Sequence, residues 1–113
     1  MLNYYYIDRD LTNIIENELK CANEVHPLFH SHHEAESVIR EEVQETVEAL
    51  ERMVKAYDDL WKTIRLDGMA TSTEYLDLKE EARRVIKEAV QVAAMCQKAI
   101  ISDDIWNEEE EDE

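Results

Sequence analysis

The chain has 113 residues, a length that fits one domain with one small hydrophobic core. One Gly and one Pro are too few for the turns of an all-β sandwich, and one Gly excludes a P-loop or a dinucleotide-binding glycine motif. The formal net charge of −16 disfavours direct binding to a nucleic-acid backbone. No run of about 20 apolar residues and no signal peptide is visible, so we expect a cytoplasmic protein without membrane spans.

The first expected helix covers about residues 9–25. Asp8 or Asp10 can cap its free amides, and Pro27 ends it because the residue before a proline disfavours the α conformation. The tyrosines of residues 4–6 are expected to form a lead-in that packs on the body. The helix is recognised by apolar residues at the three-and-four spacing of an amphipathic helix: Leu11, Ile14, Ile15, Leu19, Ala22 and Val25.

The second expected helix covers about residues 32–65. It opens on a capping box, in which the Ser31 hydroxyl accepts a hydrogen bond from the amide of Glu34. No Gly or Pro interrupts the segment that follows. The side chains expected to point inward are Ala35, Ile39, Val43, Leu50, Met53, Tyr57, Leu60, Trp61 and Ile64.

The third expected helix covers about residues 72–101, after a break at Gly68 and a second capping pattern from Thr71 to Glu74. Beyond Glu88 this helix is apolar almost all the way round, so we predict that a second subunit covers it. The eight acidic residues of 103–113, with no base among them, predict a solvated and disordered tail. The expected fold is therefore an all-α bundle of three helices, formed by residues 1–102 and completed by oligomerisation.

On the second and third expected helices, two pairs of oxygen-bearing side chains depart from the usual separation of polar and apolar faces. On a helical wheel Glu42 and Glu88 lie at the margin of the apolar stripe, and Glu45 and Gln91 follow three residues later. The short connector favours antiparallel packing, which would bring all four to one level. Hard oxygen ligands of this kind suit Mg²⁺ or Mn²⁺. The alternative is that such pairs arise by chance in an acidic chain and form a solvated face.

Several short motifs in a fixed order resemble the all-α MazG-like NTP pyrophosphohydrolases, most closely their small phage and prophage members. Glu41-Glu42-Val43-Gln44-Glu45, followed by Glu88-Ala89-Val90-Gln91, is similar to the ExxE…ExxD signature of that family. Pro27-Leu28-Phe29-His30-Ser31-His32-His33-Glu34 matches a Pro-x-Phe-x-Ser-x-His-Glu segment, and Gln91-Val92-Ala93-Ala94-Met95 matches a run that follows the second acidic helix. The resemblance covers about residues 11–101.

The resemblance implies a homo-oligomeric bundle, a dimer or tetramer, that binds Mg²⁺ and takes a nucleoside triphosphate as substrate. The family cleaves NTP or dNTP between the α and β phosphates and releases monophosphate and pyrophosphate. Carried over by position, the metal ligands are Glu42, Glu45 and Glu88, with Gln91 in the place of the family's Asp, which removes one negative charge. Glu45 is the expected catalytic base that takes a proton from the attacking water.

Three further residues are candidate substrate contacts. Lys98 lies on the same flank of its helix as Gln91 and is a candidate phosphate contact. His33 is a candidate through the resemblance, and Phe29 is a candidate for stacking on the base.

Two alternative functions stay open from the sequence. Gln91 favours a catalytically weak bundle that binds nucleotide or metal without turnover. The acidic tail and the net charge favour a protein-interaction role, such as that of a DNA mimic. The leading expectation is a Mg²⁺-dependent hydrolase with a house-cleaning role in the nucleotide pool, related to phage proteins.

Overall fold

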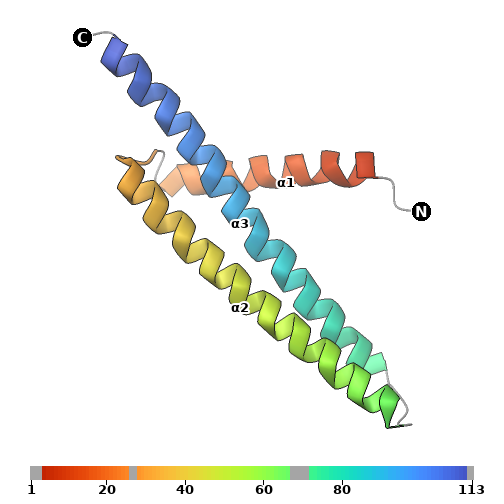
Figure 1. Ribbon diagram of the computed structural model, residues 1–113. Helices are drawn as coiled ribbons and strands as arrows, with labels where there is room; N and C mark the ends of the chain where they lie inside the picture. The colour runs from red at the N-terminus through yellow and green to blue at the C-terminus, as the bar shows by residue number, and fades with distance from the viewer. Residues whose placement is uncertain (1–3, 26–27, 67–71, 112–113) are drawn as a thin grey trace. The chain divides into compact units, whose positions relative to one another are not determined.

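The computed structural model describes residues 4–25, 28–66 and 72–111. These residues form three α-helices, which are α1 (Tyr4–Val25), α2 (His32–Arg65) and α3 (Ser72–Glu111) (Figure 1). The described ranges contain no strand, which confirms the predicted all-α class. None of the helices in these ranges is long and apolar enough to cross a membrane.

The first helix begins earlier than the sequence predicts. It starts at Tyr4, so Asp8 and Asp10 lie inside α1 and the predicted cap is wrong. Two of the three tyrosines, Tyr5 and Tyr6, do not pack on the body, because they are 72% and 52% exposed. Tyr6 instead contacts its own helix: its ring meets that of Tyr5 edge-on at 5.6 Å, and the Arg9 guanidinium lies 5.0 Å from its centroid. The helix ends at Val25, as predicted.

The second and third helices begin where the sequence predicts. The Ser31 hydroxyl accepts a hydrogen bond from the Glu34 amide at 3.1 Å, which confirms this half of the capping box at the start of α2. The helix ends at Arg65, also as predicted. α3 starts at Ser72, whereas Pro27, Gly68 and Thr71 lie outside the described residues.

By its internal packing the chain divides into two units, one of Met1–Glu42 with Val90–Glu113 and the other of Val43–Ala89. In the first unit, α1, the start of α2 and the end of α3 surround one apolar core. The buried members of this core are Leu19, Phe29, Ala35, Ala94 and Met95, and partly buried residues packed against them include Ile15, Val38, Ile39 and Trp106. The expectation of a single domain stays a prediction.

The apolar end of α3 is covered in part by this chain itself. Ala94 and Met95 pack into the core of the first unit with Leu19 of α1 and Ala35 of α2, and Val90 is 8% exposed. Among the large apolar side chains from residue 89 to 101, Ile100 is the exposed one, at 54%. Within the first unit α1 and α2 thus bury part of this face, and the cover by a second subunit stays a prediction.

The predicted disordered tail is helical as far as Glu111. Trp106, in the first turn of this tail, is partly buried against the core of the first unit, and Ser102, the residue just before the tail, is fully buried. Asn107 donates a hydrogen bond to Asp103 one turn earlier, at 3.5 Å. The acidic composition predicts solvation, but the apolar period of α3 continues through Ile105 and Trp106 and anchors the helix.

The second unit is an antiparallel hairpin of residues 43–65 of α2 and 72–89 of α3 (Figure 1). Ala49 and Leu60 are buried in it, and the Arg52 guanidinium lies 3.8 Å from the Glu81 carboxylate of α3. The inward positions predicted for α2 are only partly right here. Leu60 is buried and Met53 half-buried, whereas Val43, Leu50, Tyr57, Trp61 and Ile64 are 43% to 55% exposed.

Candidate metal centre

Three of the four predicted metal ligands lie together. One carboxylate oxygen from each of Glu42, Glu45 and Glu88 lies within 4.8 Å of the other two. Glu42 and Glu45 are one turn apart on α2, and Glu88 comes from α3. Glu42 and Glu88 are half-buried, and Glu45 is exposed. Among the residues that the structure describes, this is the one group of three or more His, Cys, Asp or Glu side chains that is close enough to hold a metal ion.

The helical geometry of the chain explains this arrangement. Residues three apart are neighbours on a helix surface, so Glu45 follows Glu42 on the same side of α2. Glu45 and Glu88 belong to the antiparallel hairpin, whose second helix returns past the first. Three carboxylates this close repel one another, and a bound cation removes that repulsion.

The donor chemistry of the cluster fits Mg²⁺ or Mn²⁺. Both ions prefer carboxylate, carbonyl and water oxygens, and Mg²⁺ is commonly held by one or two carboxylates while it keeps several waters. Glu45 is the exposed member of the cluster, so its carboxylate is accessible to water. Gln91 is half-buried on α3, one turn beyond Glu88, and its role as a fourth, neutral ligand stays a prediction.

Two predicted substrate contacts, Phe29 and Lys98, lie together in the interior of the first unit. Each is 4% exposed, and the Lys98 ammonium lies 4.7 Å from the centroid of the Phe29 ring. The Phe29 ring belongs to the core, so the structure gives it a packing role rather than an open face on which a base could stack. The burial of Lys98 likewise disfavours the predicted contact with a phosphate.

The third predicted contact, His33, is exposed on the first turn of α2. The pKa of the nearby Glu36 is lowered chiefly by the hydrogen bond that it accepts from Arg40, and His33 is the smallest contributor to this shift. Sequence reasoning missed the neighbouring His32. Its Nε2 lies 3.1 Å from Asp103 Oδ1, and its ring meets Trp106 edge-on at 4.9 Å. Ile105 and Trp106, two apolar residues within the acidic tail, were the signal for this contact.

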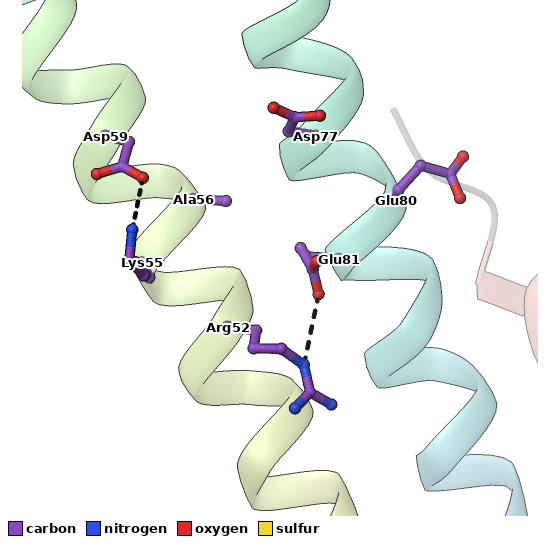
Figure 2. A pocket seen from close by; sticks show the side chains of 7 residues that line it. All are labelled: Arg52, Lys55, Ala56, Asp59, Asp77, Glu80 and Glu81. Atoms are coloured by element: carbon purple, nitrogen blue, oxygen red, sulfur yellow. Dashed lines mark hydrogen bonds and ion pairs between the residues drawn. The ribbon is translucent and has the colours of Figure 1, made fainter.

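A second feature that sequence reasoning missed is a pocket of about 360 Å³ in the hairpin. Figure 2 shows two ion pairs at its wall, Lys55 with Asp59 at 3.0 Å on α2 and Arg52 of α2 with Glu81 of α3 at 3.8 Å. The buried Glu81 oxygen accepts no hydrogen bond in the described structure, since 3.8 Å is too long for one. The lining residues are Arg52, Lys55, Ala56, Asp59, Asp77, Glu80 and Glu81.

Comparisons of the chain with protein-family models, with curated proteins and with solved structures find no match.

Proposed function

We propose that this chain is a Mg²⁺-dependent nucleoside triphosphate pyrophosphohydrolase, which converts NTP or dNTP into the monophosphate and pyrophosphate. The observation that carries the proposal is the convergence of Glu42, Glu45 and Glu88 within 4.8 Å. The order of the motifs around these residues, which resembles the MazG-like enzymes, supplies the reaction class. A house-cleaning role in the cytoplasmic nucleotide pool, in a phage-related setting, belongs to the same proposal.

The proposed roles follow from the exposure of each carboxylate. The half-buried Glu42 and Glu88 hold Mg²⁺ or Mn²⁺ from the protein side, and Gln91 adds a neutral oxygen. Bound there, the ion would neutralise phosphate charge and lower the pKa of a water molecule. Glu45 is the exposed member, so its carboxylate takes the proton of the attacking water at the open side.

The test is a product assay with a panel of NTPs and dNTPs in the presence of Mg²⁺ or Mn²⁺. The proposal expects monophosphate and pyrophosphate, and not diphosphate and phosphate. Glu88→Gln should lower turnover by at least about 100-fold, because the loss of a residue that only supports a metal ligand already costs about 10- to 100-fold. Glu80→Gln, an exposed glutamate two turns earlier on α3, serves as the matched control and should leave turnover unchanged. Release of diphosphate, or equal turnover in the two variants, would contradict the proposal.

Gln91 favours a second candidate function, a bundle that binds metal or nucleotide without turnover. A neutral amide in place of a carboxylate lowers the negative charge that holds the ion, and a second or third ion would be weakened most. This candidate expects metal binding that depends on Glu42 and Glu88, together with no product from any triphosphate of the panel.

A third candidate, an acidic protein-interaction role, gains one observation from the structure. Residues 103–111 continue α3, so the exposed Asp104 and Glu108 lie on a helix rather than in a disordered tail. Mimicry of DNA needs charge that is fixed on a folded surface. This candidate expects neither a product nor metal binding that depends on the three glutamates.

A further inference from the structure

The proposed substrate calls for a positive side chain beside the metal centre. In P-loop NTPases and protein kinases, a Lys or Arg contacts the phosphates together with the metal ions and neutralises the developing charge. In this chain the proposed metal ligands are themselves carboxylates, and the predicted phosphate contact, Lys98, is 4% exposed in the interior of the first unit. The cation therefore has to come from another position near Glu45 and Glu88.

The pocket of the hairpin identifies the flanks of α2 and α3 that lie on one side of it, because residues of both helices line this pocket (Figure 2). On a helical wheel, the α2 residues of the pocket lie between about 80° on one side of Glu45, at Lys55, and about 20° on the other side, at Ala56. Glu45 thus lies within the flank of α2 that lines the pocket.

Arg84 lies within the corresponding flank of α3. The α3 residues of the pocket lie between about 40° on one side of Arg84, at Glu80, and about 60° on the other side, at Glu81. Because one pocket joins the two flanks, Arg84 and Glu45 lie on the same side of the hairpin. Both side chains are exposed there.

The level of Arg84 along the hairpin follows from Arg52 and Glu81, whose side chains meet across it at 3.8 Å. In an antiparallel pair, the positions seven residues before Arg52 and seven residues after Glu81 are level again, and these are Glu45 and Glu88. Arg84 precedes Glu88 by four residues, which is about 6 Å along the axis and about 40° around it. An extended Arg side chain covers this distance, so its guanidinium and the metal ligands can contact the same substrate.

Arg84 is also available to a ligand by its charge. In the described part of the chain it forms no ion pair with a carboxylate. Three other cations of the hairpin, Arg52, Lys55 and Arg83, each lie 3.0 to 3.8 Å from a carboxylate. A phosphate near Arg84 therefore does not compete with an existing ion pair of this side chain.

We infer that Arg84 binds a phosphate group of the substrate, on the side of the hairpin that holds Glu45. The planar guanidinium can donate two parallel hydrogen bonds to phosphate oxygens. While the ion contacts one part of the triphosphate, Arg84 stabilises the negative charge of a neighbouring phosphate. The inference rests on the proposed function for the identity of the substrate, and it adds a residue that lies outside the motifs of the resemblance.

The first test is calorimetric binding of inorganic triphosphate, which has no base or sugar, in the presence of Mg²⁺. Arg84→Gln should bind it at least about tenfold more weakly than the wild type, the effect of one lost hydrogen bond between charged groups. Arg83→Gln removes the same charge from an exposed neighbour that pairs with Glu80, and it should keep the wild-type affinity.

Mn²⁺ binding without triphosphate is measured on the same three chains and should not weaken in Arg84→Gln. This measurement separates a lost phosphate contact from a damaged metal centre. Failure of the wild-type chain to bind inorganic triphosphate, equal triphosphate affinities in the two variants, or weaker Mn²⁺ binding by Arg84→Gln would each overturn the inference.

The second test separates this inference from the proposed hydrolase activity. With a triphosphate that the wild-type chain cleaves, Arg84→Gln should lower kcat/KM by at least about tenfold, whereas Arg83→Gln should leave it unchanged. An unchanged kcat/KM in Arg84→Gln would overturn the inference and leave the hydrolase proposal standing. Absence of product from the wild-type chain would contradict the hydrolase proposal, whereas triphosphate binding that depends on Arg84 would still support the inference.

Discussion

The hydroxyl oxygen of Ser102 accepts a hydrogen bond from the backbone N–H of Phe29 at 3.1 Å, across 73 residues of sequence. The same hydroxyl donates to the Lys98 carbonyl at 2.8 Å, and Ser102 is fully buried. This pair of bonds ties the connector between α1 and α2 to the last part of α3. It also holds Phe29 where the Lys98 ammonium covers its ring.

Ser102→Ala should therefore destabilise the protein. The change leaves the buried Phe29 N–H without a partner, which costs about 1–3 kcal/mol. Urea denaturation followed by circular dichroism measures the loss. Ser37→Ala, at an exposed position of α2, is the control and should change stability by no more than about 0.5 kcal/mol. Equal midpoints for the two variants would show that the bond does not stabilise the fold.

Trp106→Ala should also lower stability, because Trp106 packs on the core and on the His32 ring. The side chain is only partly buried, so we expect a loss of about 2 kcal/mol, below the roughly 3–5 kcal/mol typical of a fully buried Trp. Asn107→Ala changes the exposed neighbour and should be close to neutral. An unfolding midpoint for Trp106→Ala equal to that of the wild type would show that the packing of Trp106 does not stabilise the fold and that residues 103–111 are a solvated extension.

The carboxyl of Glu36 should titrate below its ordinary pKa of 4.5, chiefly because it accepts hydrogen bonds from the Arg40 guanidinium. A lowered pKa means that the pair stabilises the fold above the ordinary pKa and that this contribution is lost as the pH falls through the folded pKa. Arg40→Gln should raise the pKa of Glu36 in an NMR titration, whereas Arg83→Gln, at another helical ion pair, should not. A Glu36 pKa at or above 4.5 in the native chain would contradict this.

The sequence predicts well those features that neighbouring residues along one helix determine. The Ser31 cap marks the start of α2, and the spacing of Glu42 and Glu45 places them on one side of it. The proximity of Glu88 to this pair can also be predicted if α2 and α3 are assumed to be antiparallel. The number of residues between each glutamate and the connector then determines which positions on the two helices face each other.

The sequence could not predict which apolar helix faces are buried, because this depends on which other part of the chain packs against each face. A helical wheel marks both Met95 and Trp61 as apolar positions, yet α1 and α2 bury Met95 whereas Trp61 is 50% exposed. Composition alone likewise assigns the tail to solvent. Trp106 reverses that expectation because its ring contacts His32, which is distant in sequence. Ser102, just before the tail, is held in the same way by its hydrogen bond with the backbone of Phe29.

Gln91→Asp should strengthen the proposed metal centre. It adds a charged oxygen one turn beyond Glu88, so the Mg²⁺ concentration for half-maximal pyrophosphate release should fall and turnover should rise. Gln97→Asp, at an exposed position of α3, adds the same charge elsewhere and should change neither quantity. A lower melting temperature for Gln91→Asp without any gain in activity would show that Gln91 instead makes neutral hydrogen bonds in the fold.

The most direct measurement is a Mn²⁺ titration followed by electron paramagnetic resonance on three chains: wild type, Glu42→Gln and Glu41→Gln. The two glutamates are adjacent on α2, but Glu42 belongs to the cluster of carboxylates and Glu41 is exposed outside it. We predict saturable binding to the wild-type chain, affinity at least about tenfold weaker for Glu42→Gln, equivalent to about 1.4 kcal/mol, and no change for Glu41→Gln. Equal affinity in all three chains would show that the ions only screen the general negative charge, and would contradict a metal centre at Glu42, Glu45 and Glu88.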